Sequence, residues 1–204
     1  MILCVTGPMA AGKNAAADVL ARDFGFACVD CDVLVHTAIE NAKEKIFAAF
    51  ENLAAEKGIF LKNNDGSVNR RELGKLIFSD SKLVAMQENI VYPETELLIE
   101  KFLEENRGKD IAINATVLYK IKAIQFCSAV IFVDCPKIIR LFRAKKRDGM
   151  KYSQICARFK AQKTLFLEYR QTCADIYRVW NFGTRKRLSE KIGAIVKKCR
   201  QGIK

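Results

Sequence analysis

The stretch Val5-Thr6-Gly7-Pro8-Met9-Ala10-Ala11-Gly12-Lys13-Asn14 decides the fold class of this 204-residue chain. Its Val5 ends the short apolar run 1–5, and its last residues lead into an alanine-rich segment that reaches about residue 23. Residues 7–13 match the pattern GxxxxGK, in which glycines let the backbone wrap a phosphate and point consecutive amides at its oxygens. The stretch therefore predicts a strand, a phosphate-binding loop and a helix in that order.

The loop also predicts a nucleotide site. We expect Lys13 to reach the β- and γ-phosphates, while Asn14 stands where the pattern usually has a Ser or Thr that binds Mg²⁺. The Asn14 side-chain oxygen, or a water, would then hold the metal. The alternative is a glycine-containing turn with a surface lysine, but the strand–loop–helix context favours the nucleotide site. The expected nucleotide-binding residues of the loop are Gly7, Met9, Ala10, Ala11, Gly12, Lys13, Asn14 and Ala15.

Short apolar runs alternate with helix-period segments along the whole chain. This alternation predicts an α/β fold with a five-stranded parallel sheet covered on both faces. The long helical stretch between residues 34 and 106 is too long for one crossover, so we expect part of it to form a separate helical lobe. The expected strands are 1–5, 26–29, 110–114, 129–134 and 176–181, and the expected helices after the first are 34–57, 70–79, 82–106, 138–147, 152–172 and 189–200.

The net charge of +12 is concentrated in two segments. Residues 137–151 contain seven Lys or Arg and one acid, and residues 185–204 contain eight and one, whereas the rest of the chain has 20 basic and 21 acidic residues. Such clusters indicate a polyanionic partner, which could be nucleic acid, an anionic membrane surface or a small polyanionic molecule. Because Arg147-Asp148-Gly149 also signals a turn, we expect the segment 137–151 to be a short arm that closes over a ligand.

The apolar runs argue against a membrane protein, and the cysteines argue against a zinc or redox site. No apolar run is long enough to cross a bilayer, and no cationic leader opens the chain, so we expect a soluble cytoplasmic protein without membrane contact. The eight cysteines are then expected to stay reduced. Cys28 and Cys31 spell CxxC, but no second pair lies at suitable spacing and His36 is the only histidine, which favours packing over a zinc or redox site.

Asp30 and Asp32 follow the second expected strand. At a spacing of two on an extended chain, both carboxylates would lie on one face, past the carboxyl edge of the sheet where ligands bind. A carboxylate there can accept the proton of a substrate hydroxyl or hold Mg²⁺ through water. Either residue could instead cap the following helix; with the phosphate loop in the same sheet, a catalytic role for Asp32 is favoured.

Taken in order, several short motifs resemble the dephospho-coenzyme A kinase family. They cover residues 3 to about 183, and their order and spacing are specific although each is weak alone. The motifs are Val5-Thr6-Gly7 with Gly12-Lys13, Asp30-Cys31-Asp32 with Val35-His36, Gly66-Ser67-Val68-Asn69-Arg70-Arg71-Glu72-Leu73, Tyr92-Pro93, Val133-Asp134-Cys135-Pro136, Arg143, Arg147-Asp148-Gly149, Arg158 with Ala161-Gln162, Ala174-Asp175 and Asn181-Phe182-Gly183.

The resemblance implies a P-loop kinase three-layer fold and transfer of the ATP γ-phosphoryl group to the ribose 3′-hydroxyl of dephospho-CoA. It implies a single domain, with a core at 1–33, 107–136 and 152–204, a helical substrate lobe at 34–106 and a lid at 137–151. ATP and Mg²⁺ would be required, and a monomer or weak homo-oligomer is expected. The implied roles are catalysis for Lys13, Asp32, Arg143 and Arg147, ATP binding for Arg143 and Asn181, and substrate binding for Asp30, Asp32, His36 and Arg70, although packing or capping is an equal alternative for His36.

Two departures from the family pattern bear on metal and substrate. Asn14 replaces the hydroxyl residue, and Lys120 stands where the family commonly has an acid. The alternatives to the preferred function are a nucleoside-monophosphate type of small-molecule kinase and a P-loop protein that binds nucleotide or nucleic acid without catalysis. Phe142 is the one aromatic residue in the two basic clusters, and this scarcity disfavours nucleic acid as the partner.

Overall fold

The computed structural model describes residues 1–172 and 174–202. The chain forms two compact units: one contains Met1–Asp30 and Leu103–Lys204, and the other contains Cys31–Phe102. The division falls within four residues of the boundaries 34 and 106 that the sequence suggests for a helical lobe. We call the first the sheet unit and the second the helical unit.

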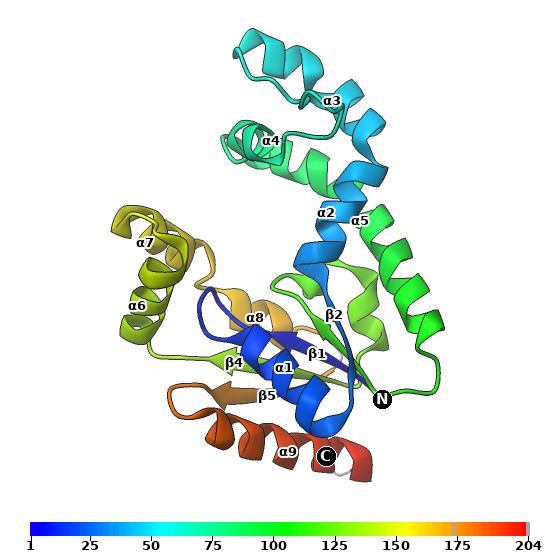
Figure 1. Ribbon diagram of the computed structural model, residues 1–204, viewed down its shortest axis with the longest axis vertical. Coiled ribbons are helices and arrows are strands. Elements are labelled where there is room, and N and C mark those ends of the chain that lie inside the picture. The colour runs from blue at the N-terminus through cyan, green and yellow to red at the C-terminus, as the bar shows by residue number, and fades with distance from the viewer. Residues whose placement is uncertain (173, 203–204) are drawn as a thin grey trace. The chain divides into compact units, whose positions relative to one another are not determined.

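A five-stranded parallel sheet forms the centre of the sheet unit (Figure 1). Its order is β2-β3-β1-β4-β5, so the strand that leads into the phosphate loop is central. The predicted parallel α/β sheet is confirmed, and each strand lies within one residue of its expected bounds. The strands are β1 (Ile2–Thr6), β2 (Ala27–Asp30), β3 (Ile111–Asn114), β4 (Ala129–Asp134) and β5 (Asp175–Trp180).

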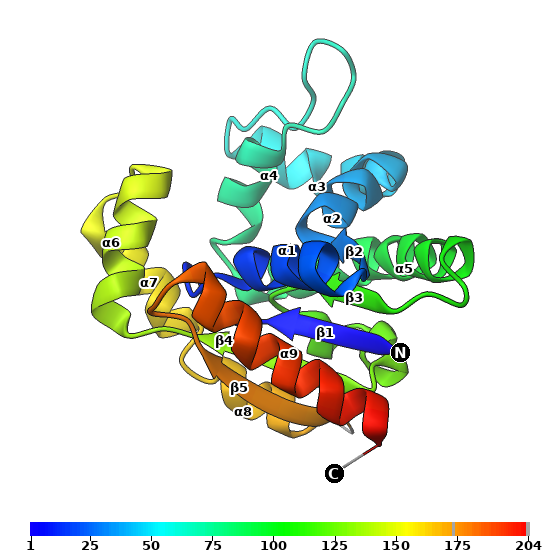
Figure 2. The ribbon, with the colours of Figure 1, turned by 60° about the horizontal axis from the view of Figure 1, so that its bottom comes forward.

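Alternation of side chains along the strands builds a core on each face of this sheet. Leu3 and Val5 pack with α1 (Lys13–Phe24) and α9 (Arg185–Gln201), which lie side by side on one face (Figures 1 and 2). Phe132 points the other way, where its ring meets Phe166 and Tyr169 of α8 (Leu165–Arg170) at 4.9 and 6.4 Å. Helices therefore cover both faces, which gives the expected three layers.

The remaining elements of the sheet unit are η1 (Leu118–Lys120), η2 (Lys122–Phe126), α6 (Lys137–Asp148) and α7 (Tyr152–Ala161). The single helix expected at 152–172 is wrong, because the chain turns between α7 and α8. Helix α9 begins four residues before the expected residue 189, since the Thr184 hydroxyl caps it by accepting the Arg187 N–H at 3.3 Å. Lys204, counted in the second basic segment, lies outside the described residues.

The helical unit has its own core. It contains α2 (Cys31–Asn41), α3 (Lys43–Glu56), α4 (Arg70–Ile77) and most of α5 (Ser81–Glu105). The expected helix 34–57 is two helices, because the chain is interrupted at Ala42. Phe47, Phe50 and Leu73 are among its buried residues. In the described part of the chain, no helix is long and apolar enough to cross a membrane.

The cysteines of the CxxC motif are packing residues, as the sequence favours. The Cys28 thiol donates to the Ala17 carbonyl at 3.4 Å, and burial raises the pKa of this thiol to about 11. Cys31 is buried at the start of α2. No group of three or more His, Cys, Asp and Glu residues suitable for a metal occurs within 1–172 and 174–202.

Candidate active site

The phosphate loop leaves the central strand β1 and ends at the first turn of α1. Three of its residues have positive φ: Gly7 at 153°, Ala10 at 61° and Gly12 at 102°. A Cβ on Gly7 would collide with the carbonyl oxygen of Val133, so this position requires glycine for space. Ala10 has a conformation that a non-glycine residue adopts only at a cost, as is common at ligand sites. Beyond the loop, the α1 N-terminus leaves backbone N–H groups without intrahelical partners, which suits an anion.

Two side chains from distant segments hold the carbonyl of Ala11. The Asn181 Nδ2 atom donates to this oxygen at 2.9 Å, and an Arg143 Nη1 atom lies at 3.3 Å from it. Asn181 is itself fixed, because its backbone N–H donates to the Asp134 carbonyl at 2.7 Å. The structure thus brings Arg143 and Asn181, both expected at the nucleotide, to the phosphate loop. Asn181 does so from the segment after β5, and Arg143 from α6.

A second cluster joins the loop to the ends of β2 and β3. The Asn114 Nδ2 atom donates to Asn14 Oδ1 at 3.2 Å and to Asp30 Oδ2 at 3.1 Å. Because a carboxylate can only accept, the Asp30 contact fixes which end of the Asn114 amide is nitrogen. Asn114 is 3% exposed, and its Oδ1 is the buried side-chain oxygen left without a hydrogen-bond partner among the described residues. Three oxygen-bearing side chains therefore meet at the carboxyl edge of the sheet.

The geometry expected for Asp30 and Asp32 is wrong in one respect. Strand β2 ends at Asp30 and α2 begins at Cys31, so Asp32 lies in the first helical turn and not on an extended chain. The alternation argument consequently does not apply to this pair. Asp32 and His36 are four residues apart on α2, which places them on one face of that helix.

The other expected substrate residue, Arg70, is the first residue of α4. The preceding residue Asn69 caps this helix, and its side chain accepts the Glu72 N–H at 3.3 Å. Both Asp32 and Arg70 are exposed residues of the helical unit. The described contacts thus place the acceptor-binding candidates on two helix N-termini of one unit.

Arg147 is exposed near the end of α6. Its Nε and Nη2 atoms donate to the two oxygens of Asp148 at 2.7 and 2.9 Å. These hydrogen bonds hold the pKa of the Asp148 carboxyl below its ordinary value. Arg143 thus touches the phosphate loop, and Arg147 pairs with Asp148.

Three residues at this site were missed by the sequence interpretation: Asn114, Arg140 and Gln162. Arg140 is only 6% exposed, and its Nε donates to the Met9 carbonyl at 2.8 Å. The Gln162 Oε1 atom accepts the Met9 N–H at 2.7 Å. Arg140 lies three residues before Arg143 in one helix, so the shared face was the available signal. Gln162 stands in one of the family motifs quoted above, but the sequence interpretation gave it no role.

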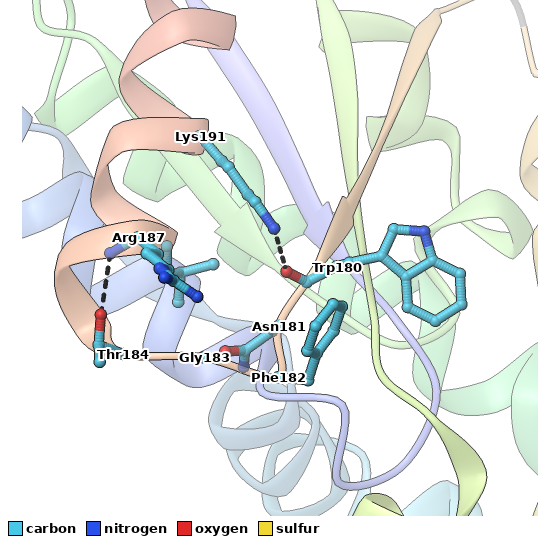
Figure 3. A pocket seen from close by; sticks show the side chains of 8 residues that line it. Trp180, Asn181, Phe182, Gly183, Thr184, Arg187 and Lys191 are labelled. Carbon is cyan, nitrogen blue, oxygen red and sulfur yellow. Dashed lines mark hydrogen bonds between the residues drawn. The ribbon is translucent and has the colours of Figure 1, made fainter.

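A pocket of about 190 Å³ opens between the end of β5 and the start of α9 (Figure 3). Its aromatic residues Trp180 and Phe182 are 41% and 55% exposed, with ring centroids 6.3 Å apart. The Lys191 ammonium donates to the Trp180 carbonyl at 2.9 Å and lies 5.5 Å from the centre of the Phe182 ring. Because Asn181 lines this pocket and its side chain donates to the Ala11 carbonyl of the phosphate loop, the two are contiguous. The lining residues are Trp180, Asn181, Phe182, Gly183, Thr184, Arg187, Leu188 and Lys191.

Gly12→Ala is expected to abolish the stabilisation of the protein by ATP. The new Cβ would collide with the Asn181 amide nitrogen and displace it from the Ala11 carbonyl, in addition to the cost of φ 102°. Gly25→Ala is the matched control, since Gly25 ends the same helix at φ 74° with no atom within 4 Å of its Cβ position.

Thermal denaturation with and without ATP compares the two variants. Both should lose about 1–2 kcal/mol of unfolding free energy, because alanine disfavours positive φ. Only Gly25→Ala should keep the wild-type shift with ATP. An unchanged shift in Gly12→Ala would contradict the role of the Asn181 contact.

Comparison with known proteins assigns the family. Residues 1–181 match the dephospho-CoA kinases. The chain belongs to the dephospho-CoA kinase family. It is 33% identical over 205 residues to the dephospho-CoA kinase of Treponema pallidum, which covers 99% of this chain and 96% of that protein. The family resemblance predicted from the sequence is therefore confirmed.

Two solved structures share the fold of this chain. A crystal structure from Thermus thermophilus has a TM-score of 0.79 at 24% identity and covers 97% of both chains. The dephospho-CoA kinase of Campylobacter jejuni has a TM-score of 0.69 at 18% identity and covers 98% of both chains. The fold is therefore that of a P-loop kinase, as expected.

Proposed function

We propose that the protein transfers the γ-phosphoryl group of ATP to the ribose 3′-hydroxyl of dephospho-CoA, giving coenzyme A and ADP. The observation that carries this proposal is the phosphate loop at the start of α1, in a chain whose residues 1–181 match the dephospho-CoA kinases. Phosphoryl transfer requires positioning and charge neutralisation more than covalent chemistry by the protein. The site contains the groups for both tasks.

The nucleotide is proposed to bind along the loop and the contiguous pocket. The backbone N–H groups of the loop and of the α1 N-terminus would bind the phosphates, with Lys13 on the β- and γ-phosphates. The exposed rings of Trp180 and Phe182 offer faces for a base, and aromatic stacking tolerates such planar ligands. Asn181 would then link base and phosphate binding, because its side chain belongs to the pocket and holds the loop.

Magnesium fits the cluster of Asn14, Asp30 and Asn114. All three present oxygen atoms, which are the ligands that Mg²⁺ prefers, and the buried Asn114 Oδ1 has no partner among the described residues. We propose that Asn14 and Asp30 hold the ion directly or through water and that Asn114 orients them. Bound there, Mg²⁺ would neutralise charge on the ATP phosphates.

Asn14→Ser is expected to retain phosphoryl transfer and to lower the Mg²⁺ concentration needed for half-maximal rate. Serine restores the hydroxyl ligand that the loop pattern usually carries. The measurement is a Mg²⁺ titration of the initial rate, with Mg²⁺-dependent ATP binding measured in parallel. Loss of activity in the variant would show that the Asn14 amide has a required role of its own.

The acceptor is proposed to bind three residues of the helical unit and Asp30, the last residue of β2. We infer that Asp32 orients the attacking hydroxyl and accepts its proton, with Asp30, His36 and Arg70 as further substrate contacts. Arg70 suits a pyrophosphate-bearing acceptor, because guanidinium binds phosphate oxygens bidentately. This assignment rests on the positions of these residues in the family motifs.

The lid is proposed to supply cations to the reacting phosphates. Arg143 already contacts the loop, and Arg147 would join when Asp148 releases it for a more highly charged partner. Closure of such a segment also excludes water, which would otherwise hydrolyse ATP. We propose that both arginines stabilise the charge of the transferring group.

A panel of acceptors tests the proposal. The purified protein is incubated with ATP, Mg²⁺ and either dephospho-CoA, AMP, CMP, UMP or shikimate, and product is identified by mass. Phosphorylation of dephospho-CoA alone supports the function. Turnover of a nucleoside monophosphate without turnover of dephospho-CoA would favour the alternative kinase, and ATP binding without any turnover would favour a binding protein.

A further inference from the structure

Both backbone groups of Met9 are held by side chains of the lid hairpin, by which we mean residues 137–162. The Gln162 Oε1 atom accepts the Met9 N–H at 2.7 Å. On the other side of the same residue, Arg140 Nε donates to the Met9 carbonyl at 2.8 Å. One residue of the phosphate loop is thus clamped from both ends of the hairpin, since Arg140 lies on α6 and Gln162 directly follows α7.

Arg140 is fixed by the hairpin itself. Its guanidinium lies 4.2 Å from the centre of the Phe159 ring of α7, and the residue is 6% exposed. A buried cation needs a hydrogen-bond acceptor, and the Met9 carbonyl provides one. The position of that carbonyl is therefore tied to the packing of α6 against α7. Gln162 is half-buried and has no such aromatic support in the contacts given.

Holding carbonyls fixes the direction of the amides that follow them. In a trans peptide the C=O of one residue and the N–H of the next point in opposite directions. Arg140 holds the Met9 carbonyl, which orients the Ala10 N–H away from the hairpin. Asn181 and Arg143 hold the Ala11 carbonyl in the same manner and so orient the Gly12 N–H. These amides are the groups with which such a loop binds phosphate.

The Ala10 backbone makes this restraint necessary. Its φ of 61° is unfavourable for a residue with a side chain. A conformation of this kind persists only when surrounding contacts determine it. The Arg140 contact acts on the Met9–Ala10 peptide through the Met9 carbonyl. The Gln162 contact acts through the Met9 N–H on the preceding Pro8–Met9 peptide, so the two contacts together fix both peptides of Met9. Without the clamp, the Met9–Ala10 peptide is free to relax to a lower-energy orientation.

We propose that Gln162 and Arg140 are positioning residues through which the lid hairpin holds the phosphate loop in its phosphate-binding conformation. The proposal rests on the proposed function only in naming the ligand, a nucleoside triphosphate. Neither residue needs to touch the ligand. The affinity of the loop for a triphosphate consequently depends on how the hairpin is packed, so the lid acts on the loop through the protein as well as on the ligand.

The test is direct binding of ATP and of inorganic tripolyphosphate to Gln162→Met, measured by calorimetry. Methionine keeps the volume but removes the acceptor for the Met9 N–H. Loss of one hydrogen bond is expected to weaken both ligands by about five- to tenfold. The two ligands should weaken equally, because the effect is on phosphate binding and not on the base. Gln171→Ala, at an exposed glutamine after α8, is the control and should bind as the wild type does.

A second variant tests the transmission through Arg140 without removing a buried charge. Phe159→Leu removes the ring beneath the guanidinium and is expected to weaken tripolyphosphate about twofold, in the same direction. If Gln162→Met does not fold, as judged by its melting temperature, this variant decides the question by itself.

Unchanged or tighter tripolyphosphate binding in folded Gln162→Met overturns the proposal. Tighter binding would mean that Gln162 competes with phosphate for the Met9 N–H. Weaker ATP binding with unchanged tripolyphosphate binding overturns it as well, because the defect would then lie at the base. These measurements use no acceptor, so they remain decisive if dephospho-CoA is not phosphorylated.

Discussion

Replacing Lys13 with alanine is expected to lower kcat by about two to three orders of magnitude while the protein stays folded. Lys13 is the first residue of α1, directly after the left-handed Gly12 that ends the phosphate loop. An ammonium at this position stabilises negative charge that shifts between the β- and γ-phosphates in the transition state. Because this charge is greater in the transition state than in bound ATP, the loss should appear mainly in kcat and less in the KM for ATP.

Lys197→Ala is the matched control for this variant. Lys197 is an exposed residue of α9, so its removal takes the same charge and side chain from the other basic segment. Initial rates with dephospho-CoA, together with melting temperatures, compare the two variants. A Lys13→Ala enzyme with nearly wild-type kcat would remove Lys13 from the mechanism. An equal loss in Lys197→Ala would mean that overall charge matters more than position.

The sheet could be predicted because its strands carry an unambiguous pattern. Ala129–Asp134 is buried at every position, follows Ser128 and ends two residues before Pro136, so both its type and its bounds follow from composition. Helix breaks were harder to place. Ala42 separates α2 from α3 without glycine or proline, and α7 ends at Ala161 in a segment that is helix-forming throughout. Tertiary packing overrides propensity at such positions.

The phosphate loop could likewise be predicted, since its glycines have positive φ and one of them cannot accommodate a Cβ. The contacts that other segments make with the loop were harder to predict. Arg143 and Asn181 were expected near the nucleotide only through the family resemblance, whereas the structure shows both at the Ala11 carbonyl. Asn114 and Gln162 meet the loop across 100 and 153 residues of chain. Such pairings depend on the register of the sheet and on the path of the lid, which no local pattern specifies.

The basic segment 137–151 shows that a count of charges does not say where each charge lies. From the sequence alone its seven cations cannot be told apart, but in the structure they differ in burial and in the groups they contact. Arg140 is buried with its guanidinium against the ring of Phe159, and this burial lowers the pKa of the guanidinium. Arg143 contacts the phosphate loop, while Arg147 is exposed to solvent and donates to Asp148. A helix with one buried, one loop-facing and one solvent-facing arginine is better suited to a small phosphorylated ligand than to a long polyanion, which would need a continuous exposed face.

Asp32→Asn is expected to reduce kcat by about two to four orders of magnitude, which is the range for loss of a general base. Asparagine has nearly the same shape as aspartate but cannot accept the proton of the attacking hydroxyl. ATP affinity should be unchanged, because Asp32 is not among the ATP contacts proposed above. The measurements are kcat with dephospho-CoA and the dissociation constant of ATP in the absence of acceptor.

Glu56→Gln controls for the lost negative charge, since Glu56 is an exposed residue at the end of α3 in the same unit. It should leave kcat and ATP affinity at their wild-type values. Asp32→Glu distinguishes the carboxylate from its position, because it keeps the base and moves it by one methylene. Partial recovery of kcat in Asp32→Glu relative to Asp32→Asn would support proton acceptance. If Asp32→Asn keeps wild-type kcat, Asp32 is not the base, and the search for the base moves to Asp30, which directly precedes α2.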